Sequence, residues 1–226
     1  MKIFRMNLVK AMALIFAMCC TLSLSAQKAG ETVKDADGNE YKTVVIGSQT
    51  WFAENLKTTK YANGNNIPNI TDKGKWVDGK TAGYCWYDNN SSNKDAYGAL
   101  YNWYAINTSN ICPNGWHVAT DADWNTLESK VGGRNKAAEA LRESGTSHWK
   151  AADGNFNDEY GFGMRAGGFR NAYGDFTWQG IDAGYWTATG KTPSYAWNRT
   201  AYYYDNHINR HEIQKCFGYS VRCVKN

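Results

Sequence analysis

Glycines divide the second half of this chain into short aromatic segments. After residue 150 the segments are 162–170, 174–180, 184–189, 195–205 and 218–226. Aromatic residues favour strands, whereas glycine favours the turns between them. The pattern therefore predicts several short antiparallel strands joined by turns.

The first half contains a predicted hairpin and one well-marked helix. Side chains alternate in character over residues 41–46, and a Gly-Ser pair separates this run from Thr50-Trp51-Phe52, which predicts a β-hairpin. Further along, Thr120 and Asp123 have the spacing of a capping box with Asp in place of Glu. The helix that follows carries apolar residues along one face, which predicts that this face packs on a core.

Two shorter helices are expected on either side of that helix, at 96–106 and 135–144. Residues 60–95 are rich in Gly, Asn, Asp and Lys, and we expect irregular loops there. Strands early, helices in the middle and strands late predict an α+β domain rather than a parallel βαβ fold.

The N-terminal segment has the order of a secretory signal. Basic residues precede an apolar run from Ala11 to Cys20, and small residues follow it. We expect a signal peptide at 1–26, cleaved after Ala26 or one residue earlier, and a single domain at 27–226. The alternative is an N-terminal membrane anchor, but the apolar run is shorter than the roughly 20 residues that a span needs. No second long apolar segment follows, so no transmembrane anchor is expected in the mature chain, which would be secreted or exposed at a cell surface.

Charge and cysteine content narrow the function classes. Without the three basic residues of the signal, 22 Lys and Arg face 21 Asp and Glu, so nothing indicates a nucleic-acid partner. The mature part holds Cys85, Cys112, Cys216 and Cys223. An even number of cysteines outside the cytoplasm favours disulfides, and four allow three pairings. No Cys-x-x-Cys or zinc-ligand spacing is present, so no metal or other cofactor is expected.

Six segments together carry a family resemblance. In chain order they are DADGNEYKTVVIGSQTWFAENLKTTKY (35–61), CWYDNN (85–90), YGALYNWYA (97–105), ICPNGWHVATDADWNTLE (111–128), AWNR (196–199) and GYSVRCVKN (218–226). They closely resemble the Fibrobacter succinogenes major paralogous domain family, whose members are exported bacterial proteins. The resemblance implies a loop-rich, C-type-lectin-like α+β fold, with two main helices packed on short antiparallel sheets. Formylglycine-generating enzymes use a similar fold.

The resemblance also implies a cysteine pairing. Cys112 and Cys223 lie in two cysteine strings typical of the family, so they are expected to form a disulfide. Cys85 and Cys216 would then pair by default.

The many aromatic residues allow two interpretations. They form the core of a domain with few aliphatic residues, which we expect for most of Trp51, Trp103, Trp116, Trp124 and Trp186. Alternatively, exposed rings stack on sugar rings while polar neighbours bind the hydroxyl groups. The candidate ligand-binding residues of that kind are Trp197, Arg199, Tyr203, Asp205, Asn206 and His207.

Calcium-dependent sugar binding is not expected. The lectin site that the resemblance suggests needs Glu-Pro-Asn or Gln-Pro-Asp and then Trp-Asn-Asp, but here Trp197-Asn198 is followed by the cation Arg199. Asp35, Asp37 and Asn39 start a calcium-loop spacing, but the glycine and the final glutamate are missing.

An enzyme is not expected either. The formylglycine-generating alternative would need a copper-binding cysteine pair such as Cys216 and Cys223, and these lie seven residues apart. No histidine lies in a catalytic string. The sequence thus predicts an exported, non-catalytic binding or adhesion module that recognises a polysaccharide or surface glycan without calcium. A structural scaffold at the cell surface is the main alternative.

Overall fold

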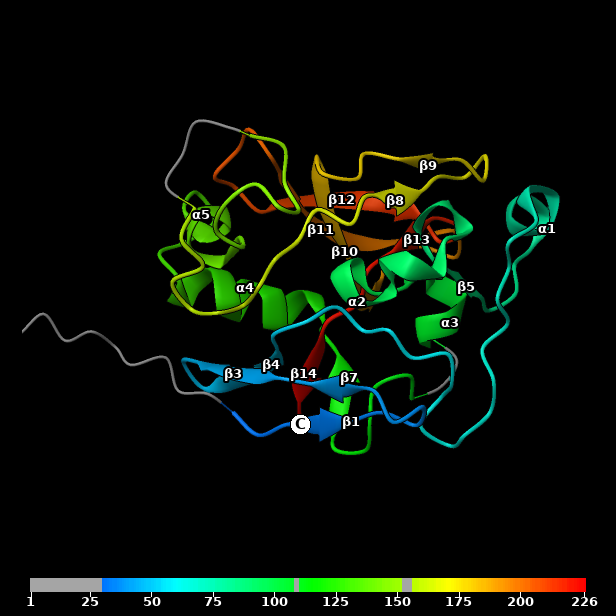
Figure 1. Ribbon diagram of the computed structural model, residues 1–226, viewed down its shortest axis with the longest axis horizontal. Helices are drawn as coiled ribbons and strands as arrows, with labels where there is room; N and C mark the ends of the chain where they lie inside the picture. Colours follow the sequence, from blue (N-terminus) through cyan, green and yellow to red (C-terminus); the bar gives the residue numbers. More distant parts are fainter. Residues whose placement is uncertain (1–29, 108–109, 152–155) are drawn as a thin grey trace, which may run out of the picture.

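The computed structural model describes residues 30–107, 110–151 and 156–226. The expected signal peptide lies outside these residues. Within them, antiparallel strands form four sheets, and short helices lie between two of the larger sheets (Figure 1). None of the helices in this described part of the chain has the length and apolar character needed to cross a membrane.

Two of the four sheets join strands from distant parts of the chain, and the other two join strands that follow one another in the sequence. A two-stranded ribbon pairs β1 (Val33–Lys34) with β2 (Glu40–Tyr41). A four-stranded sheet has the order β3 (Thr43–Ile46), β4 (Gln49–Phe52), β14 (Cys223–Lys225) and β7 (Trp116–Val118). A five-stranded sheet has the order β5 (Tyr84–Cys85), β6 (Leu100–Asn102), β13 (Gly218–Tyr219), β8 (Phe169–Arg170) and β9 (Phe176–Thr177). The longest strands, β10 (Asp182–Gly190), β11 (Tyr195–Tyr202) and β12 (Asn209–Gln214), form the fourth sheet.

The helices are small. They are α1 (Lys73–Asp78), α2 (Lys94–Tyr97), α3 (Trp103–Asn107), α4 (Asp121–Lys130) and α5 (Ala137–Leu141), with 3-10 turns η1 (Tyr87–Asn89) and η2 (Ser91–Asn93). The expected α+β, C-type-lectin-like class with two main helices packed on sheets is therefore wrong, because the described chain consists mainly of antiparallel sheets with short helical pieces.

A glycine explains the largest error in the helix prediction. The expected helix at 96–106 is instead α2, strand β6 and α3. Gly98 ends α2 with φ of +73°, a conformation that costs glycine little. A β-carbon at this position would lie 2.8 Å from the carbonyl oxygen of Leu56, so tertiary packing also demands glycine here. The other short helix, expected at 135–144, extends only over α5, and α1 forms where loops were expected.

Two local predictions are confirmed. Strands β3 and β4 form the hairpin around Gly47-Ser48. Helix α4 begins with the capping box, in which Thr120 Oγ1 accepts from the Asp123 amide and the Asp123 carboxylate accepts from the Thr120 amide.

Two aromatic-rich cores lie on opposite sides of the strands. Neighbouring residues of one strand enter different cores, because successive side chains of a strand point to opposite faces. Such pairs are Phe52 and Trp51 in β4, Trp186 and Tyr185 in β10, and Cys223 and Val224 in β14. The five tryptophans expected in the core are all buried, as predicted.

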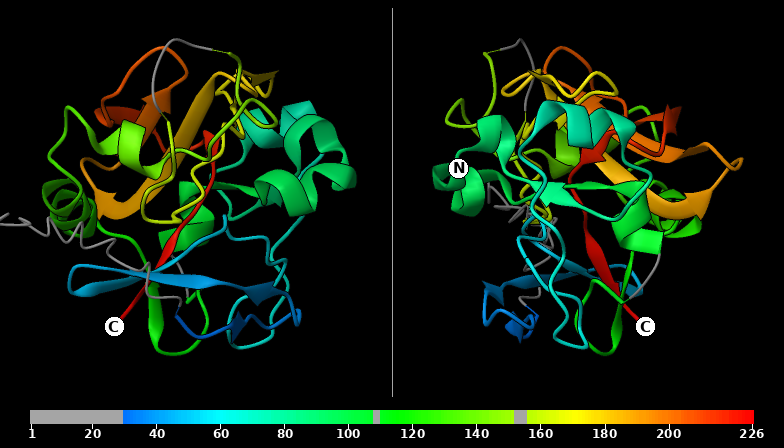
Figure 2. Two further views of the ribbon diagram at one scale, coloured as in Figure 1. Left: turned by 60° about the vertical axis from the view of Figure 1, so that its left-hand side comes forward. Right: turned by 90° about the vertical axis from the view of Figure 1, so that its right-hand side faces the viewer.

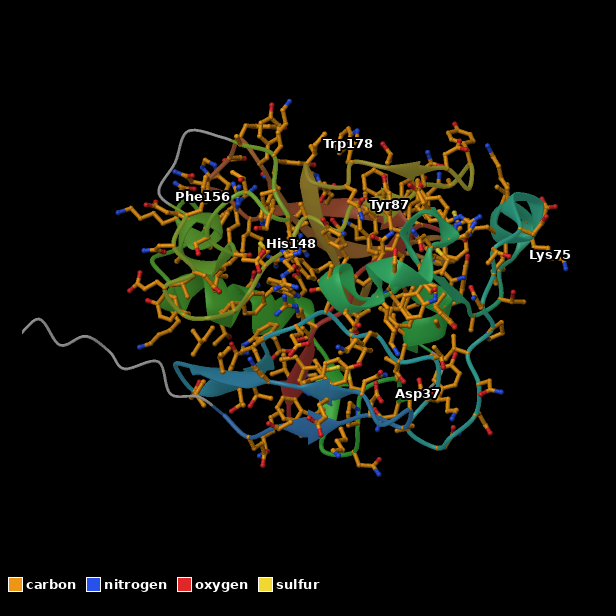
Figure 3. The ribbon with its side chains drawn as sticks, viewed as in Figure 1. Asp37, Lys75, Tyr87, His148, Phe156 and Trp178 are labelled. Carbon is orange, nitrogen blue, oxygen red and sulfur yellow. A yellow bond between two sulfur atoms is a disulfide. The ribbon has the colours of Figure 1, made fainter. Side chains whose placement is uncertain are left out.

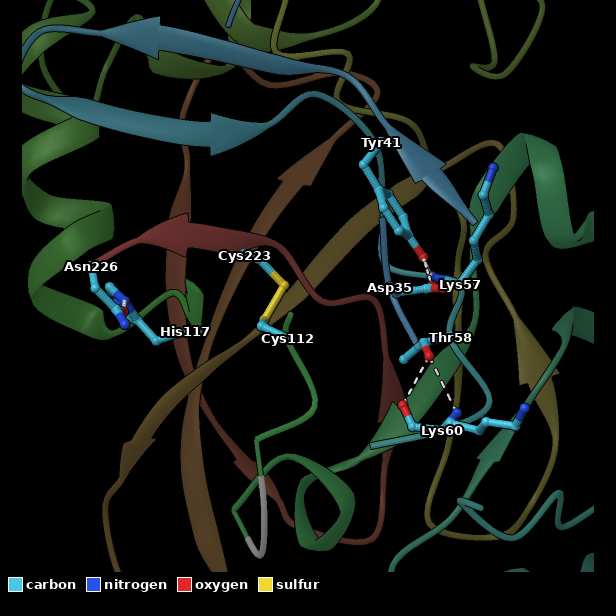
Figure 4. Close-up of a disulfide and its surroundings, with 9 residues drawn as sticks. All are labelled: Asp35, Tyr41, Lys57, Thr58, Lys60, Cys112, His117, Cys223 and Asn226. Atoms are coloured by element: carbon cyan, nitrogen blue, oxygen red, sulfur yellow. Dashed lines mark hydrogen bonds between the residues drawn. A yellow bond between two sulfur atoms is a disulfide. The ribbon is translucent and has the colours of Figure 1, made fainter. Parts of the chain in front are cut away.

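The C-terminal segment joins two of the sheets. Strand β13 belongs to the five-stranded sheet, and β14, a few residues later, belongs to the four-stranded one (Figure 2). Beside β14, Cys112 and Cys223 form the predicted disulfide (Figure 4). Cys85 and Cys216 are both free thiols in the structure, so the second bridge expected by default is not formed.

Candidate functional site

The two faces of the β10–β11–β12 sheet have different surroundings. In β11, Trp197 and Arg199 point to one face, and Asn198, Thr200 and Tyr202 point to the other, as strand alternation requires. The Arg199 face is covered by helix α4, through contacts with Asp121, Asn125 and Glu128. The opposite face borders a cavity.

This cavity has a volume of about 310 Å³ and is walled largely by aromatic rings. Its lining residues are Phe169, Trp178, Asp182, Asn198, Thr200, Tyr202, His211, Glu212, Ile213, Phe217 and Tyr219. Five strands (β8, β10, β11, β12 and β13) and the turns beside them supply these side chains, from positions as far apart as 169 and 219. We call this space the aromatic cavity.

Asp182, the first residue of β10, is the unusual polar residue of the cavity. It is 2% exposed, and its Oδ1 is buried without a hydrogen-bond partner in the part of the chain that the structure describes. Burial alone raises the pKa of Asp182 well above its ordinary value. Buried polar groups in folded proteins usually have partners, so this unpartnered carboxyl oxygen beside a cavity makes Asp182 a candidate site residue.

The phenol groups near Asp182 are neutral around pH 7. Burial, followed by the nearby charge of Asp182, raises the pKa of Tyr202 to about 12. The same two effects, in the same order, raise the pKa of Tyr219 well above its usual value. Both phenols therefore act as neutral hydrogen-bonding and stacking groups.

Trp178 forms the exposed rim of the cavity. It is 47% exposed, lies at the upper edge of the molecule in Figure 3, and contacts Phe169 and Tyr202 edge-on. Its φ of +65° lies in the left-handed region, which is strained for a bulky residue. In this conformation its carbonyl accepts from the Asp182 amide at 3.0 Å, so one turn positions both the rim tryptophan and the buried acid. Such strain clusters at binding and catalytic sites.

Four other polar side chains of the cavity, those of Asn198, Thr200, Tyr202 and His211, have partners. Asn198 Nδ2 donates to the Tyr185 carbonyl, and Thr200 Oγ1 donates to Asn198 Oδ1. Tyr202 Oη and His211 Nε2 are 3.3 Å apart. Burial, and then the charge of Arg134, lowers the pKa of His211, so this ring is neutral around pH 7.

None of the six predicted ligand-binding residues lines the aromatic cavity. Arg199 is 2% exposed and donates to Asp121 and Glu128 at 2.5 Å each, so its guanidinium is already paired. The Trp197 ring lies between Lys191, 4.4 Å from its centroid, and Arg210, 3.2 Å from it.

The other four predicted residues lie together in the connection between β11 and β12. The Tyr203 ring contacts Lys150 Nζ, and the Asn206 carbonyl accepts from the Ala138 amide. Asp205 Oδ1 accepts from the backbone and ring nitrogens of His207. Their polar groups hold the connection in shape.

The sequence did contain a signal for part of the cavity. Asn198, Thr200 and Tyr202 alternate along β11 with Trp197 and Arg199, so the same strand pattern identifies either face equally well. The two faces of β11 differ only in what lies against them, which is α4 on the Arg199 face and the aromatic cavity on the opposite face. Asp182 and Trp178 carry no comparable sequence signal.

The thiol pair that a formylglycine-generating enzyme would use is not formed by Cys216 and Cys223. The sulfur of Cys223 is bonded to Cys112, and Cys216 is a half-buried free thiol. The calcium-loop spacing has a local explanation as well, because Asp35 Oδ1 accepts from the amides of Asp37 and Asn39 and stabilises that turn.

The model of the Fibrobacter succinogenes major domain family matches residues 44–225, which include every strand and helix from β4 to β14. No curated protein and no solved structure matches the chain.

Proposed function

Since this chain belongs to the Fibrobacter succinogenes major domain family, we propose that it is an exported, non-catalytic module that binds a polysaccharide or surface glycan in the aromatic cavity, without calcium. The proposal places the ligand on the Asn198–Tyr202 face of the β10–β11–β12 sheet. This is the face opposite to the one that Arg199 occupies.

One observation carries the proposal: aromatic rings and an unpartnered buried carboxyl meet in a single cavity. Small-ligand sites are mostly apolar concavities of roughly 300 Å³ or more, with a few polar groups that fix orientation. The aromatic cavity has this size and this composition. Trp178, which is 47% exposed, offers its ring to the apolar side of a sugar, and Asp182 offers hydrogen bonds to its polar edge.

The remaining support concerns export. The basic, apolar and small-residue order of residues 1–26 is that of a secretory signal. The disulfide Cys112–Cys223 is consistent with an oxidising environment. A secreted or surface-exposed module would meet glycans in that environment.

The test is binding of the purified protein to a glycan array, followed by titration calorimetry with the best ligand. We expect Trp178→Ala to weaken binding about tenfold or more, because removal of an aromatic anchor costs on the order of 2 kcal/mol. Tyr173→Ala is the matched control, since Tyr173 is 75% exposed and lies outside the cavity lining.

Two results would contradict the proposal. One is the absence of binding to any glycan on the array. The other is equal loss of affinity in the Trp178 and Tyr173 variants. Binding that disappears with a chelator would overturn its calcium-free form.

A further inference from the structure

We propose that the sugar unit held in the aromatic cavity carries a protonated amine, and that this ammonium group pairs with Asp182. This inference deepens the proposed glycan-binding function and rests on it. It assigns the ligand to a chemical class, namely glycans that contain amino sugars with free amines.

The first argument is the charge of the cavity wall. No lysine or arginine is among its lining residues, and two of them, Asp182 and Glu212, are acidic. Glu212 is already satisfied, because its Oε1 accepts from Lys191 Nζ at 2.7 Å. Asp182 is thus the acidic group left for a ligand, and an anionic sugar would find no cation to bind.

The second argument is the cost of burying Asp182. A buried carboxyl group without a hydrogen-bond partner costs free energy that a ligand can recover. A sugar hydroxyl would supply a neutral hydrogen bond. An ammonium group supplies a charge-assisted one, which is roughly twice as strong.

The third argument is the ring environment. A cation within about 6 Å of an aromatic face is attracted to it, most strongly at a tryptophan. Trp178, Tyr202 and Tyr219 line the same cavity as Asp182. The cavity therefore combines aromatic rings with one available carboxyl group, and its lining contains no lysine or arginine. This combination suits an organic ammonium group.

Pairing would change the protonation of the site. Near neutral pH, the raised pKa of Asp182 favours the protonated carboxyl in the empty site more than in a free aspartate. The groups facing it are Tyr202 from β11 and Tyr219 from β13, with His211 from β12 beyond Tyr202, and all three are neutral there. The incoming ammonium favours the carboxylate, so a proton that Asp182 holds leaves to solvent while the amine keeps its own.

The experiment compares the affinity of the full-length mature protein for three tetrasaccharides. These tetrasaccharides differ only in one substituent of each sugar unit. They are β-1,4-linked glucosamine with free amines, its N-acetylated form, and the corresponding glucose oligomer. Titration calorimetry near pH 6, where the amine is protonated, should give at least about tenfold tighter binding for the free amine.

Two variants locate the effect. Asp182→Asn should remove the preference for the free amine, so that the free-amine and N-acetylated forms bind this variant with equal affinity. Asp205→Asn, in the connection between β11 and β12, is the matched control and should keep the preference. If Asp182→Asn does not fold, the comparison of the three ligands on the unaltered protein still decides the question.

The outcomes separate this inference from the proposed function. Equal affinity for all three ligands, or a preference that survives Asp182→Asn, would contradict the pairing of a protonated amine with Asp182. The proposed glycan binding would be unaffected by either result. Equally tight binding of a lysine oligomer overturns the assignment to a sugar. Failure of every glycan to bind overturns both proposals.

Discussion

The ring of Tyr219 lies directly on Gly184, with no room for a side chain between them. A β-carbon at residue 184 would come within 2.4 Å of the Cδ1 and Cε1 atoms of this ring. Gly184 lies in β10 opposite Thr200, two residues after Asp182. Its missing side chain lets β13 bring an aromatic wall of the cavity against the sheet that carries the buried acid.

Gly184→Ala should therefore disturb both stability and binding. We expect the free energy of unfolding to fall by about 1–3 kcal/mol, the usual cost of overpacking, and glycan affinity to fall with it. Urea denaturation and calorimetry measure the two effects. Gly190→Ala in the same strand is the control, because its β-carbon would meet its nearest neighbour at an ordinary 3.5 Å. Equal stability of the two variants would contradict this account of Gly184.

Removal of the disulfide should be costly. The bridge joins residues 111 apart, and the chain-entropy model gives about 4–5 kcal/mol for a loop of this length. We expect the double variant C112A/C223A to lose about this much unfolding free energy in guanidinium without reductant. Cys216→Ala, which removes a half-buried free thiol, should change stability little. If a reductant leaves the stability of the unaltered protein unchanged, the prediction is wrong.

Arg199 and Arg210 both pair with Asp121 but should differ in importance. Arg199 is buried and also pairs with Glu128, so Arg199→Ala leaves a buried carboxylate alone, at a cost of about 3–5 kcal/mol. The Arg210 side chain is 36% exposed, and its replacement should cost less than about 1 kcal/mol. Chemical denaturation of both variants checks this. Similar losses of unfolding free energy in the two variants would show that burial does not make the Arg199 ion pairs more important than the Arg210 ion pair.

Stability should depend on pH through Asp182. Below its ordinary pKa of 3.8 the carboxyl is protonated in both the folded and the unfolded chain. Above that value the unfolded chain ionises first, because the folded pKa is raised. The contribution of Asp182 to stability thus falls as pH rises, with a slope of up to about 1.4 kcal/mol per pH unit, until the folded pKa is reached.

Urea denaturation of the ligand-free protein and of Asp182→Asn at about pH 4 and pH 7 measures this effect. The unaltered protein should lose more stability than the variant between the two pH values. Glu128 and Asp158, whose pKa values burial also raises, are present in both proteins and cancel in the comparison. Parallel pH profiles would contradict a buried, unpaired Asp182.

Local features were predictable where they depend only on residues that are close together in the sequence. The hairpin around Gly47-Ser48 and the capping box of Thr120 and Asp123 need only residues a few positions apart. The expected helix at 96–106 failed because Gly98 must pass close to the backbone of Leu56, a contact that no local pattern reveals.

The sequence by itself determined the family, the short antiparallel strands, the buried tryptophans and the long disulfide. It did so because these follow from motifs, glycine spacing and the large apolar area of aromatic side chains. The tertiary structure alone decided which face of β11 is open, since strand alternation marks two faces and says nothing of what covers each. It also decided that Asp182 is buried without a partner among the rings of Trp178, Tyr202 and Tyr219, because burial depends on chain segments that meet only after folding.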